Sequence, residues 1–213
     1  MPEILHPARQ VWPDLSLVFA PDRVLFHGDG RTISGTEFLR GAHRLAAQLP
    51  DRPVINLCRD LRGFTLLFAA ILIRGQHALL TSDRTAGRLA ELMASHDAVC
   101  VTIEGDPEAD DLPSSGMTLR DPLGTSRDLT DSMETVLHPV IPADRLGAIV
   151  FTSGSTGEPV GHRKSWGTLV TRSVGARGLL DPEVTPASLI GTVPPYHMYG
   201  FETLVLQSLN TRV

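Results

Sequence analysis

The chain has 213 residues, of which 42% are hydrophobic, so it can form one large domain or two small lobes with a sizeable core. Its formal net charge of −5 gives no support for general binding to nucleic acid or to anionic membranes. The longest apolar stretch, Phe64 to Ile73, is too short to cross a bilayer, which takes about 20 residues.

The first 50 residues predict a small β-hairpin followed by a helix. We expect an irregular entry at residues 1–21, and then two short strands at 23–26 and 31–33 that are joined by a tight turn at 27–30. Ser34 followed by Glu37 forms a capping box, which is a signature of a helix start. The helix should continue to about Leu49, because apolar residues recur on one face.

Strands and helices alternate over the next 50 residues. We expect strands at 53–58, 76–81 and 98–103, and helices at 61–74 and from Ser82 or Asp83 to 95. This alternation predicts an α/β fold with a mostly parallel sheet covered by helices on both faces. The only cysteines, Cys58 and Cys100, lie in these strands, as buried free thiols often do. A reduced, cytoplasmic protein is the simple prediction, and a single disulfide is the alternative.

An acidic, proline- and glycine-rich excursion is expected at residues 104–131. Its cluster of Glu108, Asp110 and Asp111 raises the hypothesis of a metal site. The carboxylates lack the spacing of a known calcium motif, however, so we predict a solvated acidic loop and no metal site.

The next strand, Leu146 to Thr152, leads into a loop that is rich in glycine and hydroxyl side chains. A helix is expected from Ser165 to Leu180. Glycines let backbone N–H groups approach a phosphate closely, and Ser and Thr add hydroxyl donors. The loop fits neither the common G-x-x-x-x-G-K-[ST] phosphate loop nor a G-x-S-x-G hydrolase elbow. The alternative is an ordinary flexible turn.

A last strand is predicted at residues 188–193, followed by His197 and by a helix over 200–209. His197 follows a strand end, which is where α/β proteins place ligands. It lacks metal-ligand partners in the sequence, so the choice lies between a pocket wall and an ordinary loop residue.

Two segments resemble motifs of the adenylate-forming superfamily, which contains acyl- and aryl-CoA ligases, luciferases and the adenylation domains of peptide synthetases. The first is T-S-G-S-T-G-x-P at residues 152–159, and the second is P-x-x-H-x-x-G at residues 194–200. The strand, turn and helix that end in the 34–49 helix are also similar to the start of these enzymes. The resemblance implies that the first loop binds the β- and γ-phosphates of ATP, through Thr152, Ser153, Gly154, Ser155, Thr156 and Gly157. It also implies that His197 and Gly200 border the acyl site.

The sequence departs from the family at Val160, where a lysine is usual. A branch that resembles the aryl-carrier ligases of bacterial aryl-polyene pathways has T-G-x-P-x-x-H-x-K-x-W instead, which His162, Lys164 and Trp166 match. We therefore assign the phosphate-facing cation to Lys164, with Arg163 as the rival. The resemblance makes Lys164 and Thr156 the expected catalytic residues.

The resemblance implies an ATP- and Mg²⁺-dependent enzyme that activates a carboxylic acid as an acyl-adenylate. The acid would be aromatic, such as a hydroxybenzoate, and the acyl group would pass to CoA or to a phosphopantetheinyl carrier protein. Residues 1–213 correspond to a truncated N-terminal adenylation domain without the C-terminal lid domain. We therefore expect this fragment alone to be inactive. The alternative is a non-catalytic nucleotide-binding or interaction module that keeps the scaffold.

Overall fold

The computed structural model describes residues 13–28, 30–109, 112–123, 138–152, 160–180 and 188–211, with the backbone alone at 178–180. Within these ranges, no helix is long and apolar enough to span a membrane.

A six-stranded sheet forms the centre of the molecule, in the order β10-β9-β5-β4-β6-β7. Its strands are β4 (Val54–Asn56), β5 (Ala78–Thr81), β6 (Val99–Ile103), β7 (Met117–Leu119), β9 (Leu146–Thr152) and β10 (Val160–Ser165). The first five are parallel to one another, and β10 runs antiparallel to β9. The predicted α/β class with a mostly parallel sheet is confirmed.

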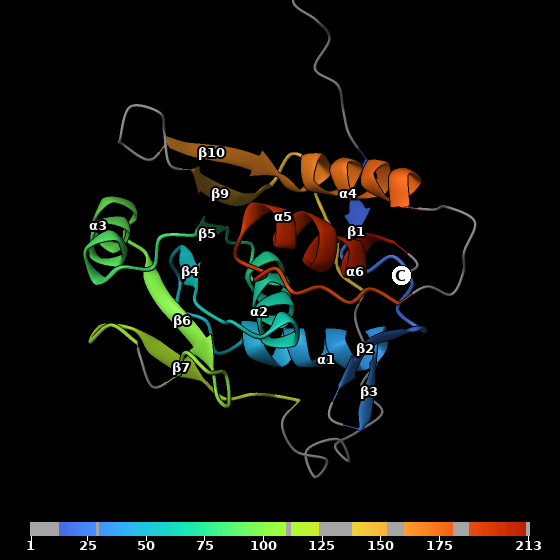
Figure 1. The fold of residues 1–213 in the computed structure, drawn as a ribbon, viewed down its shortest axis with the longest axis horizontal. Helices are drawn as coiled ribbons and strands as arrows, with labels where there is room; N and C mark the ends of the chain where they lie inside the picture. Colours follow the sequence, from blue (N-terminus) through green and yellow to red (C-terminus); the bar gives the residue numbers. More distant parts are fainter. Residues whose placement is uncertain are drawn as a thin grey trace, which may run out of the picture.

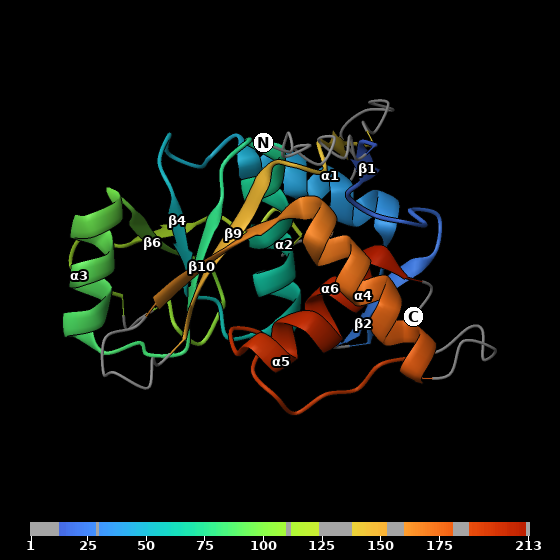
Figure 2. The same cartoon turned by 90° about the horizontal axis from the view of Figure 1, so that it is seen from above.

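Helices cover both faces of this sheet (Figure 1). One face carries α1 (Gly35–Ala46), α2 (Leu61–Ile73) and α4 (Trp166–Leu180), and the other carries α3 (Ala86–His96). Figure 2 shows α3 by itself on one side of the strands and the other helices opposite. The main apolar core therefore lies on the α2 side, and a smaller cluster lies beneath α3.

The two N-terminal helices begin at side-chain caps that the local sequence supplies. Ser34 Oγ accepts the Glu37 N–H at 3.1 Å at the start of α1. Asp60 does the same for α2, where it accepts the N–H groups of Arg62 and Gly63 at 3.1 and 2.7 Å. Gly75 follows α2 with φ +81°, a left-handed conformation that favours glycine and ends the helix. By contrast, α3 begins after Thr85, rather than at the predicted Ser82 or Asp83 cap.

Short elements complete the fold. Two small antiparallel pairs are formed by β1 (Leu15–Ser16) with β8 (Val140–Ile141), and by β2 (Val24–Gly28) with β3 (Arg31–Ser34). The last described residues form one continuous helical segment of α5 (Met198–Gly200), a π-helical stretch η2 (Phe201–Val205) and α6 (Leu206–Asn210). The Phe201 ring packs edge-on against Phe64 and Phe68 of α2, at centroid distances of 6.3 and 5.0 Å.

Three predictions about strands were wrong. Residues 160–165 form strand β10 rather than a loop, because their backbone pairs with β9. The excursion contains β7, which pairs with β6 through the residues at 117–119. Residues 188–193 form no strand, and Ile190 is 96% exposed instead of buried in a sheet.

Candidate functional site

The glycine-rich loop is held between two paired strands. Thr152, the last residue of β9, lies opposite Val160, the first residue of β10. The register of β5 with β9 aligns Thr81 with Phe151, so the loop leaves the sheet at the carboxyl end of its parallel strands. The predicted phosphate-binding residues Ser153, Gly154, Ser155, Thr156 and Gly157 lie outside the described residues. Thr152 is described, and it is exposed at this edge.

Carboxyl ends of parallel strands are where open α/β sheets place their ligands. At this edge the chain turns sharply after β5, because Thr81 Oγ1 donates to the Asp83 carbonyl at 3.1 Å and accepts the Asp83 N–H at 3.2 Å. Arg84 follows this turn and reaches the end of β4.

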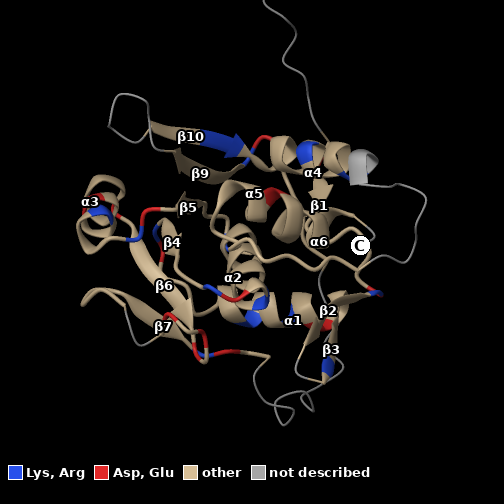
Figure 3. Cartoon of the chain, in the orientation of Figure 1, with Lys and Arg blue, Asp and Glu red and all other residues tan. Residues whose placement is uncertain are grey.

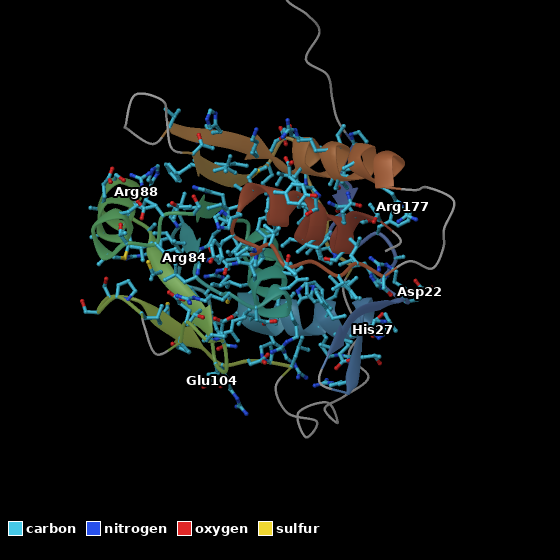
Figure 4. All side chains as sticks on the ribbon, in the orientation of Figure 1. Asp22, His27, Arg84, Arg88, Glu104 and Arg177 are labelled. Atoms are coloured by element: carbon cyan, nitrogen blue, oxygen red, sulfur yellow. The ribbon has the colours of Figure 1, made fainter. Side chains whose placement is uncertain are left out.

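Arg84 is a site residue that the sequence did not indicate. Its Nη1 donates to the Leu57 carbonyl at 2.7 Å, and its Cζ lies 3.6 Å from the centre of the Tyr196 ring. Burial lowers the pKa of Arg84 from its usual value, although Tyr196 and Glu108 oppose the shift. An arginine remains charged in proteins, so a cation is fixed among the strand ends between α3 and α2 (Figure 4).

His197 is connected to this cation by Tyr196, which contacts both residues. The Tyr196 and His197 rings are 5.0 Å apart and inclined by 34°, and the His197 side chain is exposed. The His197 N–H donates to the Pro194 carbonyl at 3.1 Å, and His197 is the N-cap of α5. The sheet edge therefore presents His197 outward, while Tyr196 packs inward.

Gly200 is held by close packing. A Cβ on this residue would lie 2.2 Å from the Pro194 oxygen, a distance that real Cβ atoms essentially never show. The P-x-x-H-x-x-G spacing thus has a physical reason in this chain, because only glycine lets α5 fold back against the carbonyl of its first proline.

The two candidate cations Arg163 and Lys164 are adjacent on β10 (Figure 3). Arg163 lies opposite Ile149 and Lys164 opposite Ala148 in the pairing with β9. Neighbouring side chains on a strand point to opposite faces, so Arg163 lies on the α3 face, where Ile149 packs, and Lys164 on the α2 face. Lys164 lies four residue steps along the strand from the Val160–Thr152 pair, which corresponds to about 13 Å.

Further basic side chains lie on the α3 face of the β9–β10 hairpin. The Arg88 guanidinium lies 5.1 Å from the centre of the Phe151 ring, and the His96 ring contacts Phe151 edge-on at 5.4 Å. Burial lowers the pKa of His77, and the charges of Arg163 and His96 lower it further. Sequence reasoning missed this group because its members come from three separate elements.

Glu108 of the acidic cluster has a structural role, which corrects the solvated-loop prediction for this residue. Glu108 is 6% exposed and pairs with Arg59 Nε. Asp106 is also buried and accepts the N–H groups of Arg59, Asp60 and Glu108 at 2.9 to 3.1 Å. Asp110 and Asp111 lie outside the described residues. No group of three metal-ligating side chains occurs in the part of the chain that the structure describes.

Comparison with known proteins identifies a family for most of the chain. The model of the AMP-binding enzyme family matches residues 18–211. No curated protein sequence matches the chain.

Three solved structures with a similar fold are informative. One is the o-succinylbenzoate CoA synthetase of Bacillus subtilis with ATP and magnesium, at 17% identity and a TM-score of 0.67, covering 89% of this chain and 52% of that one. The same synthetase with an acyl-adenylate intermediate has 18% identity and a TM-score of 0.64, covering 90% of this chain and 51% of that one. Apo MatB from Rhodopseudomonas palustris has 22% identity and a TM-score of 0.68, covering 90% of this chain and 41% of that one. The chain thus spans about half the length of these structures or less, and at these identities the likeness shows the fold.

Proposed function

Because the chain belongs to the AMP-binding enzyme family, we propose that it contributes the phosphate-binding part of an ATP-dependent acid–thiol ligase. In this reaction the carboxylate oxygen of an acid attacks the α-phosphorus of ATP. The bond from the α-phosphorus to the bridging oxygen breaks, and pyrophosphate leaves. A thiol then takes the acyl group from the adenylate and releases AMP.

The observation that carries this proposal is the pairing of Thr152 with Val160 at the carboxyl edge of the sheet, on either side of the motif residues 153–159. A hairpin that is anchored on both sides can hold backbone N–H groups in place before the ligand arrives, which is how an enzyme stabilises charge at low reorganisation cost. The motif supplies the glycines and hydroxyls, and the sheet supplies the anchor.

Each residue has a proposed role in this reaction. Thr152, Ser153, Gly154, Ser155, Thr156 and Gly157 bind the phosphates, and Thr156 donates to the leaving pyrophosphate. Lys164, with Arg163 as its rival, neutralises the charge that develops there. His197 borders the acid, and Gly200 keeps the His197 turn in place. Magnesium enters with ATP as the MgATP substrate.

The substrate and its acceptor are proposed at a finer level from the H-x-K-x-W pattern at residues 162–166. An aromatic acid such as a hydroxybenzoate is the favoured substrate. CoA or a phosphopantetheinyl carrier protein is the thiol, and the cytoplasm is the compartment. The 213-residue chain alone is proposed to be inactive, since it spans about half of its structural neighbours.

Carboxylate-dependent exchange of pyrophosphate into ATP tests the proposal. The 213-residue chain is assayed alone and within the longest open reading frame that contains it, with a panel of aryl and fatty acids. Exchange with one acid class in the longer protein is the expected result. Folded protein that exchanges with no acid would favour the alternative, a non-catalytic nucleotide-binding or interaction module.

Two variants then separate the candidate cations. Lys164→Ala should lower the exchange rate if Lys164 faces the phosphates, and Arg163→Ala should lower it if the rival does. A hydrogen bond to a charged group contributes about 1.5–3 kcal/mol. The loss should therefore be about 10- to 100-fold for one variant and small for the other, whereas a scaffold protein would bind its partner equally well with either change.

A further inference from the structure

The guanidinium of Arg84 covers the carboxyl end of β4. Nη1 donates to the Leu57 carbonyl at 2.7 Å, and Nη2 donates to the carbonyls of Asn56 and Cys58, each at 3.4 Å. These are three consecutive carbonyls at the end of β4, of which Asn56 is the last residue. Arg84 thus binds the scaffold through one edge of its guanidinium.

The flat face of the same guanidinium lies on Tyr196. The distance of 3.6 Å from Cζ to the ring centroid is that of direct stacking, which a planar, delocalised cation favours. Tyr196 in turn lies against His197, with ring centroids 5.0 Å apart. A continuous series of contacts therefore runs from the end of β4 to the exposed imidazole.

The far side of the His197 turn is fixed by other residues. Phe201 anchors the helical segment to α2, and the Pro194 carbonyl accepts the His197 N–H and closes on Gly200. These contacts fix the backbone of the turn. The Tyr196 ring packs against the edge of the main core, and the Arg84 guanidinium lies over its face.

We propose that Arg84 is a positioning residue for the acid-binding segment at residues 194–200. Arg84 holds Tyr196 by a cation–π contact and thereby orients His197 at the sheet edge. This inference rests on the proposed function, in which His197 borders the acid. Arg84 itself faces backbone carbonyls and a ring, so it acts through Tyr196 rather than on the acid. Its removal should impair binding of the acid and spare binding of ATP.

Pyrophosphate exchange provides the test. It is measured with the longest reading frame that contains the chain, first with 4-hydroxybenzoate and then with the most active acid of the panel. Arg84→Ala should raise the KM for the acid about tenfold, the size of a desolvated cation–π contact, and leave the KM for ATP within about twofold. Arg84→Lys should recover part of the loss, because an ammonium group also binds an aromatic face but lacks the planar guanidinium that stacks on Tyr196. Tyr196→Leu, which leaves Arg84 on its carbonyls, should raise the acid KM by a similar factor.

Arg62→Ala is the matched control, because it removes a partly exposed arginine that pairs with Asp121 at 2.9 Å rather than with Tyr196. It should leave both KM values unchanged. If the unmodified protein exchanges with no acid, the proposed function fails, and the inference fails with it. If it exchanges normally, the inference is overturned when Arg84→Ala changes both KM values equally, or when Arg84→Lys is no better than Arg84→Ala. Where Arg84→Ala does not fold, an unchanged acid KM in Tyr196→Leu overturns it.

Discussion

Replacing Gly200 with alanine should destabilise the protein through one specific overlap. The added Cβ would lie 2.2 Å from the Pro194 oxygen, 2.9 Å from its carbon and 3.1 Å from the Val193 oxygen. All three are backbone atoms, so no side chain can rotate away. The backbone must shift by about 1 Å to restore an ordinary contact, and overpacking of this kind costs about 1–3 kcal/mol.

Helix propensity acts in the opposite direction, since alanine is favoured over glycine by about 1 kcal/mol in a helix interior. Gly200 is the last residue of the single turn of α5, so only part of this gain applies there. We expect a net loss of about 2 kcal/mol. For a chain of this size that corresponds to a fall in Tm of about 4–8 °C.

Gly175→Ala is the matched control, because Gly175 lies in α4 and a Cβ there would meet no atom within 4 Å. It should raise Tm by about 2–4 °C, since the propensity gain is unopposed. Urea and thermal unfolding of both variants, measured beside the unmodified chain, give the comparison. A Gly200→Ala protein as stable as Gly175→Ala would refute the reasoning, because the Pro194 contact would then carry no cost.

Two titration predictions follow from burial. Below pH 6.5 the unfolded chain protonates His77 before the folded protein does, because burial, Arg163 and His96 lower its folded pKa. The free energy of unfolding should therefore fall as the pH drops from 6.5, and His77→Gln should weaken this dependence in urea titrations at pH 7.5 and 5.5. An equal loss of unfolding free energy between the two pH values in both proteins would contradict it. Burial also raises the pKa of Cys58 to about 12 and of Cys100 to about 11. A thiol reagent at pH 8 should label neither in the folded protein and both in denaturant, and rapid labelling of folded protein would contradict this.

The sequence predicted those elements whose signals are local. Strand β9 has the predicted bounds of Leu146 and Thr152, because its residues form an apolar run bounded by turn residues. The Ser34 cap lies where the sequence placed it, because a cap depends on a few neighbouring residues. From these signals the sequence predicted the fold class and a buried strand that leads into the loop.

The strands that were missed depend on pairing. The sequence of β10 contains His162, Arg163 and Lys164 and lacks apolar alternation, but the hairpin with β9 supplies its hydrogen bonds. As an edge strand it tolerates charged side chains. The error at residues 188–193 is the converse, because apolar residues there predicted a strand for which the described chain offers no partner. Arg84 was missed for the same reason, since its contacts come from β4 and from Tyr196, both distant in the sequence.

The rivalry between Arg163 and Lys164 changes once β10 is a strand. A loop would let both side chains turn toward the same phosphate, whereas a strand sends them to opposite faces of the sheet. Arg163 lies on the face where burial, together with the charges of Arg163 and His96, lowers the pKa of His77, and Lys164 lies on the face of the main core. A phosphate on the α3 face would lie on the side of Arg163, and a phosphate on the α2 face would lie on the side of Lys164. Removing one cation therefore changes the field most strongly on its own face of the hairpin, which is why single substitutions can decide between them.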